Sequence, residues 1–177
     1  MTGHGDLRRI LPHRHPILLV DRILEESVTA RGAESWLVAL KAVTGSEPCY
    51  ADVDEDAPDS AYAYPAALVL ESFVQSAAAL WARAARANGQ PHEGTLFFAG
   101  ARNVKLHSPV HPGDRLLHRV RLDDAVGATA FLSGTTSLAD RSGVPVLSVG
   151  SVVLAVRAEP QVEEAPEPAT VAAAEEA

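Results

Sequence analysis

The feature that most constrains the fold is a long apolar segment in the middle of the chain, YPAALVLESFVQSAAALWA, from Tyr64 to Ala82. Pro65 suits the first position of a helix and Gly89 the position just past its end, so we expect a single helix of about six turns between them. The segment is apolar on nearly all sides until Arg83, and other elements must therefore cover most of its surface. One carboxylate, Glu71, interrupts its first half.

The rest of the chain is dominated by segments with strand-like patterns. After a short helix expected at Asp6 to Ile10, two strands are predicted before the long helix, in PILLVDRILEESV and AESWLVALKAV. Four more are predicted after it, in TLFFAGARNVKL, DRLLHRVRLDD, ATAFLSGTTSLAD and VPVLSVGSVVLAV, separated by turn-forming sequences. In DRLLHRVRLDD, every second residue is apolar or His118, which predicts one buried face. We therefore expect an α+β fold in which an antiparallel sheet of about six strands wraps around one long central helix.

Composition and charge restrict the domain organisation and the classes of partner. The chain has 177 residues and a net charge of −8. Its last 19 residues, 159–177, hold six glutamates and no Lys or Arg, so residues 1–158 carry only about −2. We expect residues 1–158 to form one domain and residues 159–177 to be a disordered acidic tail rich in Ala, Pro and Glu. A body this close to neutral gives no electrostatic reason to expect a nucleic-acid partner.

The sequence also predicts the cellular compartment and excludes some kinds of bonding and metal site. Cys49 is the only cysteine, which excludes an internal disulfide and a thiolate metal cluster within one chain. The N-terminal residues lack the apolar core of a signal peptide, and no uninterrupted apolar run is long enough to span a bilayer. We therefore expect a cytoplasmic protein without a membrane association, a metal site or a bound cofactor.

Three blocks of sequence, taken together and in order, resemble a known family. They are LPHRHPILLVDRI (11–23), YPAALVLESFVQSAA (64–78) and LFFAGARNVKLHSPVHPGD (96–114). Each block is weak evidence alone, but jointly they resemble the bacterial β-hydroxyacyl-(acyl-carrier-protein) dehydratases of the hotdog fold, which are FabZ-like enzymes. The resemblance extends over roughly residues 6–157.

The resemblance implies an active site at a dimer interface, with a histidine from one subunit and a glutamate from the long helix of the other. It places the glutamate at Glu71 and a supporting glutamine at Gln75, one turn along the same helix face. Elimination of water from a β-hydroxyacyl thioester needs a base, an acid and a donor to the thioester carbonyl. A carboxylate in an apolar environment holds its proton more tightly and can act as the acid.

The same resemblance implies how the substrate is delivered and held. The acyl chain would arrive on the phosphopantetheine arm of an acyl carrier protein. The helix N-terminus at Ala66 and Ala67 would provide the amide donor to the carbonyl. Tyr64 and Phe98 are expected to contact the substrate. The alternative interpretation of the helix carboxylate is that Glu71 only bonds Gln75 or a backbone group inside a tight dimer.

The histidine that the family carries before the long helix has no counterpart here. The corresponding segment is CYADVDEDAPDSAYA, in which Val53 or Ala57 takes the position of the histidine, and no histidine occurs between His15 and His92. Among the other histidines, we expect His13 to be a structural hydrogen-bonding residue and His118 a core residue. We expect His107 and His111 to be solvated. Five acids in this segment are expected to be exposed: Asp52, Asp54, Glu55, Asp56 and Asp59.

A retained glutamate helix beside a lost histidine predicts the non-histidine subunit of a heterodimeric dehydratase, a lyase of fatty acid or polyketide biosynthesis. Such a chain would lend Glu71 to a histidine-bearing hotdog partner and would be inactive or nearly so alone. Two alternatives remain open. One is a homodimer that binds an acyl chain or a carrier protein without chemistry. The other is a different hotdog activity, a thioesterase or an isomerase, with Asp52, Asp54 or Glu71 as the base.

Overall fold

The computed structural model describes residues 2–29, 34–91, 94–140 and 143–157. The acidic segment 159–177 lies outside the described residues. Two α-helices, two short 3₁₀ helices and six strands follow in the order α1 (His4–Ile10), β1 (Arg22–Ser27), β2 (Trp36–Ala42), η1 (Pro48–Tyr50), η2 (Asp59–Tyr62), α2 (Ala66–Ala87), β3 (Thr95–Leu106), β4 (Arg115–Val126), β5 (Thr129–Leu138) and β6 (Pro145–Arg157).

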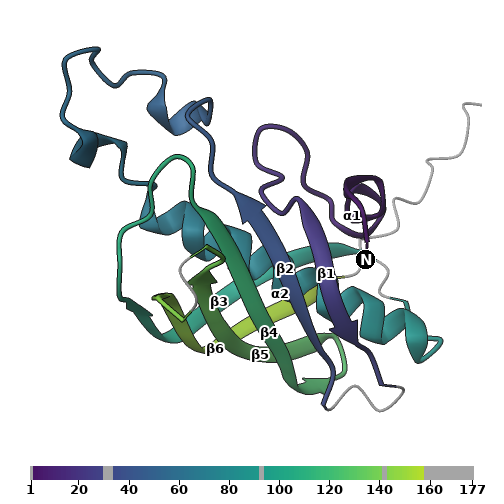
Figure 1. Cartoon of the computed structure of the whole chain (residues 1–177). Helices are drawn as coiled ribbons and strands as arrows, with labels where there is room; N and C mark the ends of the chain where they lie inside the picture. The colour runs from purple at the N-terminus through teal and green to yellow at the C-terminus, as the bar shows by residue number, and fades with distance from the viewer. Residues whose placement is uncertain (1, 30–33, 92–93, 141–142, 158–177) are drawn as a thin grey trace, which may run out of the picture.

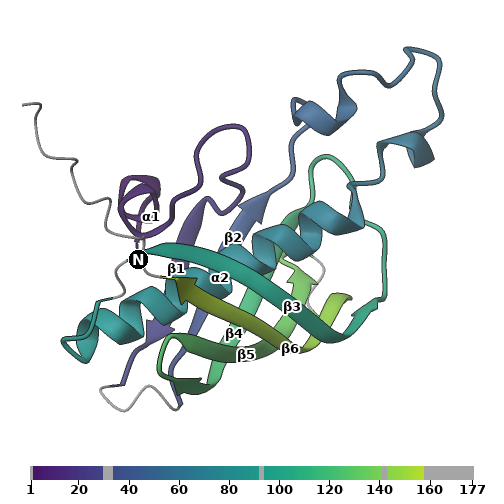
Figure 2. The ribbon, with the colours of Figure 1, turned by 180° about the vertical axis from the view of Figure 1, so that it is seen from behind.

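The six strands form one antiparallel sheet that curves around α2 (Figure 1, Figure 2). The strand order is β1-β2-β4-β5-β6-β3, so β1 and β3 are the two edges. Register shifts interrupt several strand pairs, and bulges of this kind increase the local twist and bend a sheet. At one of them, a Cβ on Gly134 would lie 2.0 Å from the carbonyl oxygen of Arg119, so only glycine fits there. The expected α+β hotdog architecture is confirmed.

The long apolar helix forms as predicted, with one shift at its start. Pro65 is the N-cap of α2 instead of its first helical residue, and Gly89 follows the C-cap with a φ of 69°, as its expected position requires. By length and composition, the span Asp59–Ala87 is apolar enough to cross a membrane. The interior of α2 is instead covered by the sheet, because Phe73, Ala77 and Leu80 are fully buried. The apolar helix is therefore the core helix of the domain.

Strand β4 shows the predicted alternation, and it brings His118 into the core beside α2. The Nδ1 atom of His118 lies 2.8 Å from the Thr136 hydroxyl, and its ring meets the ring of Phe73 edge to face. Burial, assisted by the positive charge of Lys41, lowers the pKa of His118 to about 3. The expectation of a core histidine at this position is confirmed by its complete burial.

A buried ion pair at the end of β2 was not predicted from the sequence. The alternation of β2 places Lys41 on the same face as Leu37 and Ala39, and all three are buried. The Lys41 ammonium donates to the carbonyl of Ala42 at 2.7 Å and to the Glu47 carboxylate, and the two charged side chains are only 6% and 10% exposed. The ammonium also lies 5.7 Å from the ring centroid of Tyr64, immediately before α2. The pair therefore ties the segment after β2 to the start of the helix.

The segment between β2 and α2 is anchored at both ends to the same turn. At its start, Val43 N–H donates to Asp114 O at 3.0 Å and Gly113 N–H donates to Val43 O at 2.8 Å. At its end, Tyr64 N–H donates to Val110 O at 2.7 Å. Between these anchors, the chain extends away from the sheet and includes η1 and η2, in a region expected to be a loop (Figure 1).

The buried imidazole makes stability sensitive to acid. An unfolded histidine binds a proton near pH 6.5, whereas folded His118 does so only near pH 3, so the contribution to stability is complete above pH 6.5 and falls as the pH drops toward 3. Between pH 7.5 and pH 5, this one group should lower the free energy of unfolding by about 2 kcal/mol. Urea denaturation should show that His118→Gln removes this pH-dependent loss, whereas His107→Gln, at an exposed histidine, retains it. Equal losses in both variants would contradict the assignment.

Removal of one member of the buried ion pair should cost more than removal of both. Lys41→Met leaves the Glu47 carboxylate buried without its partner, and we expect it to lower the free energy of unfolding by about 3–5 kcal/mol. The double variant Lys41→Met/Glu47→Leu should recover most of that loss, since it leaves no uncompensated charge. Thermal and chemical denaturation of the single and double variants measure the difference. A double variant no more stable than Lys41→Met would show that the pair is not coupled.

Candidate functional site

The candidate site is centred on Glu71, in the second turn of α2, where the sheet leaves one side of the helix uncovered. Its side chain is 30% exposed, whereas Ser72 and Phe73, the next two residues, are fully buried. The carboxylate is therefore half-buried in the single chain, and not enclosed as the apolar sequence around it led us to expect. It is held by the protein on one side and open to a second molecule on the other.

Gln75 binds the Glu71 carboxylate and fixes the chain segment that passes over it. Its amide nitrogen donates to Glu71 Oε1 at 2.8 Å and to the carbonyl of Ile17 at 2.6 Å. Its amide oxygen accepts from the N–H groups of Leu19 at 2.9 Å and Val20 at 3.4 Å. The side chain is fully buried with both ends of its amide bonded. The predicted contact between the two side chains of this helix face is therefore present, and it extends to residues 17–20.

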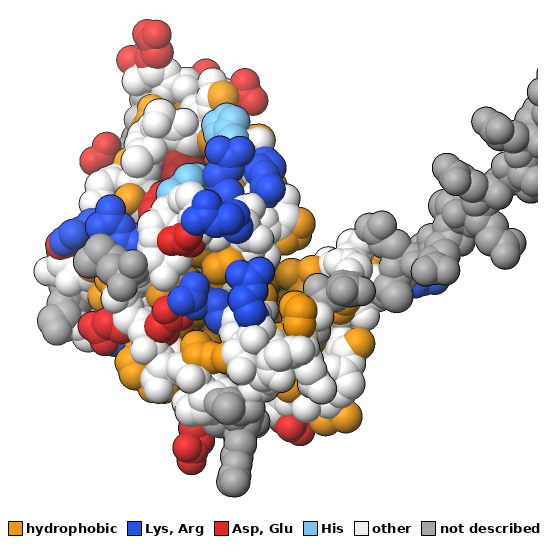
Figure 3. All heavy atoms as spheres, turned by 90° about the vertical axis from the view of Figure 1, so that its right-hand side faces the viewer, with side chains coloured by type: hydrophobic (Ala, Val, Ile, Leu, Met, Phe, Trp, Pro, Cys, Tyr) orange, Lys and Arg blue, Asp and Glu red, His pale blue; other side chains and the backbone are white. Residues whose placement is uncertain are grey.

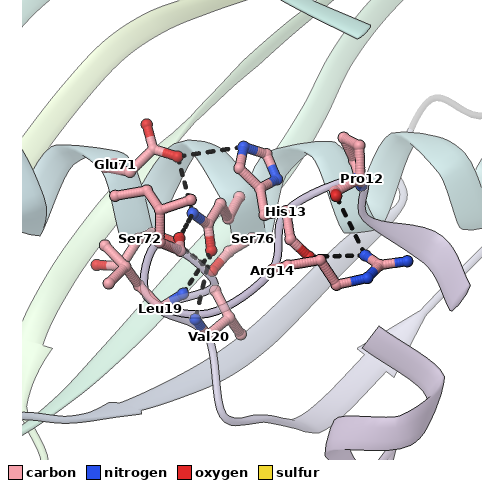
Figure 4. A network of polar contacts seen from close by, with 10 residues as sticks. Pro12, His13, Arg14, Leu19, Val20, Glu71, Ser72 and Ser76 are labelled. Carbon is pink, nitrogen blue, oxygen red and sulfur yellow. Dashed lines mark hydrogen bonds and ion pairs between the residues drawn. The ribbon is translucent and has the colours of Figure 1, made fainter. Parts of the chain in front are cut away.

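An imidazole of the same chain also contacts Glu71. His13 Nε2 lies 3.4 Å from Glu71 Oε1, and the two side chains are 26% and 30% exposed (Figure 4). The other ring nitrogen, Nδ1, is buried and has no hydrogen-bond partner in the described part of the chain. His13, which we expected to be a structural hydrogen-bonding residue, therefore brings an imidazole of this chain within reach of Glu71, and the half-site prediction did not include this contact.

The turn that carries His13 is shaped by its neighbour Arg14. One guanidinium nitrogen of Arg14 donates to the carbonyls of Leu11 at 2.8 Å, Pro12 at 3.1 Å and His13 at 2.7 Å (Figure 4). The carbonyl of Arg14 in turn accepts from the N–H groups of Ile17 and Leu18. These bonds close residues 11–18 into a compact turn, which Gln75 then attaches to α2. The position of the imidazole is thus determined by two separate sets of bonds.

The N-terminus of α2 lies less than two turns before Glu71 and presents backbone donors. Leu68 and Val69 both donate to the carbonyl of Pro65, while Ala66 and Ala67 are exposed. No acceptor for the amides of Ala66 and Ala67 is found among the residues that the structure describes, as is usual for the first turn of a helix. Their proposed role as donors to a substrate carbonyl is therefore compatible with the geometry.

The two other residues expected to contact substrate lie in different surroundings. Tyr64 is buried, with its ring against Tyr50 and beneath Lys41, and burial raises its pKa well above the usual value of a phenol. Its hydroxyl has no partner within the described ranges. Phe98 is half-exposed on the edge strand β3. In the single chain, neither residue lies in a demonstrated contact with Glu71.

Val53 and Ala57 are the two positions that we expected to replace the family's histidine. Val53 and Ala57 are both half-buried in the segment between β2 and α2. The five acids of that segment are exposed, as expected. Among the other histidines, His107 is exposed and bonded to Ser148, whereas His111 is half-buried. No cluster of three or more His, Cys, Asp or Glu residues suited to a metal ion occurs in residues 2–29, 34–91, 94–140 and 143–157.

Sequence comparison relates the chain to one enzyme family. The FabA-like domain family matches residues 11–142. The chain is 34% identical over 156 residues to the 3-hydroxyacyl-[acyl-carrier-protein] dehydratase FabZ of Dichelobacter nodosus, which covers 76% of this chain and 96% of that protein. It is 36% identical over 128 residues to the FabZ of Haemophilus ducreyi, with coverage of 71% and 75%.

Comparison of structures supports the fold independently. The dehydratase heterocomplex ApeI:P from Xenorhabdus doucetiae superposes with a TM-score of 0.65 at 14% identity, over 85% of this chain and 90% of that one. A hypothetical thioesterase with coenzyme A from Streptococcus pneumoniae superposes with a TM-score of 0.54 at 10% identity, over 88% and 97%. Identities this low demonstrate a shared hotdog fold and nothing finer. On the sequence match and the architecture together, the chain belongs to the FabA-like family of hotdog proteins, alongside the FabZ dehydratases.

Proposed function

We propose that this chain is a subunit of a 3-hydroxyacyl-acyl-carrier-protein dehydratase, and that it contributes Glu71 to an active site completed by a histidine of a second hotdog subunit. The observation that carries the proposal is the half-exposed carboxylate of Glu71, which Gln75 holds on one side and leaves open on the other. The FabZ relatives are 3-hydroxyacyl-[acyl-carrier-protein] dehydratases by name. The pathway would be fatty acid or polyketide biosynthesis, in the cytoplasm.

The reaction needs two groups, a base close to C2 and an acid close to the C3 hydroxyl. A base removes the proton from C2, the C3–O bond breaks as an acid protonates the leaving hydroxyl, and the electron pair of the C2–H bond forms the C2–C3 double bond. The products are an enoyl thioester and water. Glu71 supplies the acid, and the amides of Ala66 and Ala67 polarise the thioester carbonyl. The base is then the group that remains to be supplied.

In the observed geometry, His13 is not positioned to act as the base. Its Nε2 atom lies 3.4 Å from Glu71 Oε1, which is a direct contact and leaves no room for a substrate carbon chain between the two groups. It contacts the same carboxylate oxygen that accepts from Gln75. We therefore assign His13 and Gln75 as positioning residues that orient the Glu71 carboxylate. We assign the imidazole that acts as the base to a partner subunit.

The edge strand β3 offers the surface on which such a partner would assemble. Strand β3 pairs only with β6, and four large apolar side chains on it are 40–50% exposed: Phe97, Phe98, Val104 and Leu106. An unpaired edge with exposed apolar residues favours pairing with a strand of another chain. The partner would be a histidine-bearing hotdog subunit, and the fold shared with the ApeI:P dehydratase heterocomplex is consistent with an unequal pair. The substrate would be carried by the phosphopantetheine of an acyl carrier protein.

The proposal is tested by reconstitution with a histidine-bearing FabZ-like subunit of the same genome. The co-purified pair should dehydrate a 3-hydroxyacyl-acyl-carrier-protein, with the loss of substrate and the gain of enoyl product followed by mass spectrometry. Glu71→Gln in this chain should lower kcat by about 10²- to 10⁴-fold, the usual cost of losing one acid–base group. Glu25→Gln, at an exposed glutamate of β1, is the matched control and should leave kcat unchanged. Failure of this chain to associate with any such subunit would refute the heterodimer.

A second candidate function rests on the contact between His13 and Glu71. If the imidazole moves away from the carboxylate when substrate binds, one chain would supply both groups, and a homodimer would be active alone. The two candidates differ in the effect of His13→Gln. In a heterodimer, we expect this change to lower kcat by no more than about tenfold with little change in KM, since it only loosens the orientation of Glu71. Turnover by the pure chain that His13→Gln abolishes would establish the homodimer instead.

A non-catalytic role would give a different result in the same assays. A homodimer that only binds an acyl chain or a carrier protein would return the acyl thioester unchanged after prolonged incubation, alone or with a histidine-bearing subunit. Glu71→Gln would then leave the binding affinity unaltered. Hydrolysis of the thioester by the pure chain, without an enoyl product, would point to a thioesterase.

A further inference from the structure

Strand β3, one edge of the sheet, carries charge of only one sign. Arg102 and Lys105 are exposed on it, and residues 95–113 contain no Asp or Glu. The neighbouring strand β6 contains no acidic residue either. In the part of the chain that the structure describes, no carboxylate pairs with Arg102 or Lys105. This edge of the sheet therefore carries positive charge without a counter-charge.

The register of β3 with β6 shows that the two cations face neutral side chains inside the chain. Arg102 lies opposite Ser151, and Lys105 lies opposite Ser148. Opposite charges at facing positions of two strands stabilise a sheet, and like charges destabilise it. The side of β3 that faces away from β6 is the place where a further strand can bring a counter-charge.

Elsewhere on the domain, basic side chains are accompanied by acids. Figure 3, which views the side of the molecule that carries α1, shows basic side chains with acidic side chains beside them. In the chain, Arg9 pairs with Asp6, and Arg83 pairs with Glu26. The absence of acids is thus a property of β3 and β6 and not of the surface as a whole.

A second copy of this chain cannot bring the counter-charge to β3. Two identical edge strands that pair about a two-fold axis run antiparallel, and the same residues face each other in both halves of the contact. Because β3 holds two cations and no anion, every register places each cation opposite a neutral residue or another cation. In one such register, Arg102 of each copy faces Lys105 of the other. Pairing of two like copies therefore gains no charge attraction, and in some registers it adds repulsion.

We propose that β3 selects its partner by charge, and that it pairs with the edge strand of a different hotdog subunit that carries Asp or Glu opposite Arg102 and Lys105. This inference rests on the proposed function, because it specifies the edge strand of the histidine-bearing subunit described above. The exposed apolar side chains of β3 contribute affinity to any pairing, since they are removed from water in each case. The two cations distinguish an acidic edge from a second copy of this chain.

A charge-reversed copy of the same chain provides an acidic edge on an otherwise identical strand. Arg102→Glu/Lys105→Glu changes two exposed side chains that have no carboxylate partner among the described residues. The parent chain is mixed in equal amounts with an isotope-labelled form of this variant, and the dimers are counted by native mass spectrometry. The mixed dimer should exceed its statistical share by about tenfold, and a higher ammonium acetate concentration should reduce the excess.

A matched variant on an interior strand separates the charge of β3 from the charge of the whole chain. Arg119→Glu/Arg121→Glu makes the same change of charge at exposed positions of β4, which pairs with β2 and β5. It removes the exposed pair of Arg121 with Asp123, which contributes little to stability. When this variant is mixed with the parent chain, the mixed dimer should form in its statistical share.

Removal of the two cations without addition of acids tests the repulsion alone. Arg102→Gln/Lys105→Gln should form its own dimer at least as readily as the parent chain does, because no like charges meet across the edge. It should not select the parent chain over itself by more than about twofold. A preference for the parent chain as strong as that of the charge-reversed variant would contradict selection by opposite charge.

Hydrogen exchange locates the contact and separates the two proposals. Backbone amides of residues 97–106 should exchange more slowly in the mixed dimer than in the parent chain alone. Slower exchange there with only a statistical share of mixed dimer would overturn the charge selection and leave the dehydratase proposal standing. No mixed dimer at all, a mixed dimer without this protection, or an equal excess with the β4 variant would also overturn it. Failure of the dehydratase proposal would instead appear as an assembled pair without turnover.

Discussion

The candidate site depends on one buried amide. Gln75 reaches from α2 to the backbone of residues 17–20 and to the Glu71 carboxylate. Both its amide nitrogen and its amide oxygen form hydrogen bonds inside the protein. An amide left without these partners in the core would cost free energy, so the helix and the turn that carries His13 are coupled. The Glu71 carboxylate is therefore oriented by the same bond network that closes the N-terminal part of the domain.

Much of the fold could be predicted because its signals are local. The apolar helix, the alternation of β4 and the glycine after α2 each appear within a few residues of sequence, and the sheet follows from the need to cover the helix. The contact of Gln75 with Glu71 was also predictable, since residues four apart share a helix face. The contact with His13 was not, because 58 residues separate it from Glu71 and the turn of residues 11–18 has no periodic pattern. The buried Lys41–Glu47 pair was missed because charged residues are rarely buried.

The surroundings of Glu71 fit the proposal that a single chain provides only part of the site. The carboxylate is contacted by Gln75 and His13, and the Glu71 side chain remains 30% exposed. The exposed apolar edge of β3 shows that the domain has further surface to bury. Both features are accounted for if the chain functions in an assembly, in which the same association covers the edge strand and brings a group opposite the carboxylate.

Residues 43–64 are attached to the domain at both ends, and this affects how the sequence between the two attachments can change. Both ends are bonded to the turn at 110–114, so this turn helps to locate the start of α2, together with the Lys41–Glu47 pair close to the first anchor. A loop closed by fixed ends tolerates insertions at small entropic cost. The residues between the anchors can therefore lengthen, turn acidic or lose a reactive side chain while the helix carboxylate keeps its place. The sequence of this segment can thus change without a change in the fold.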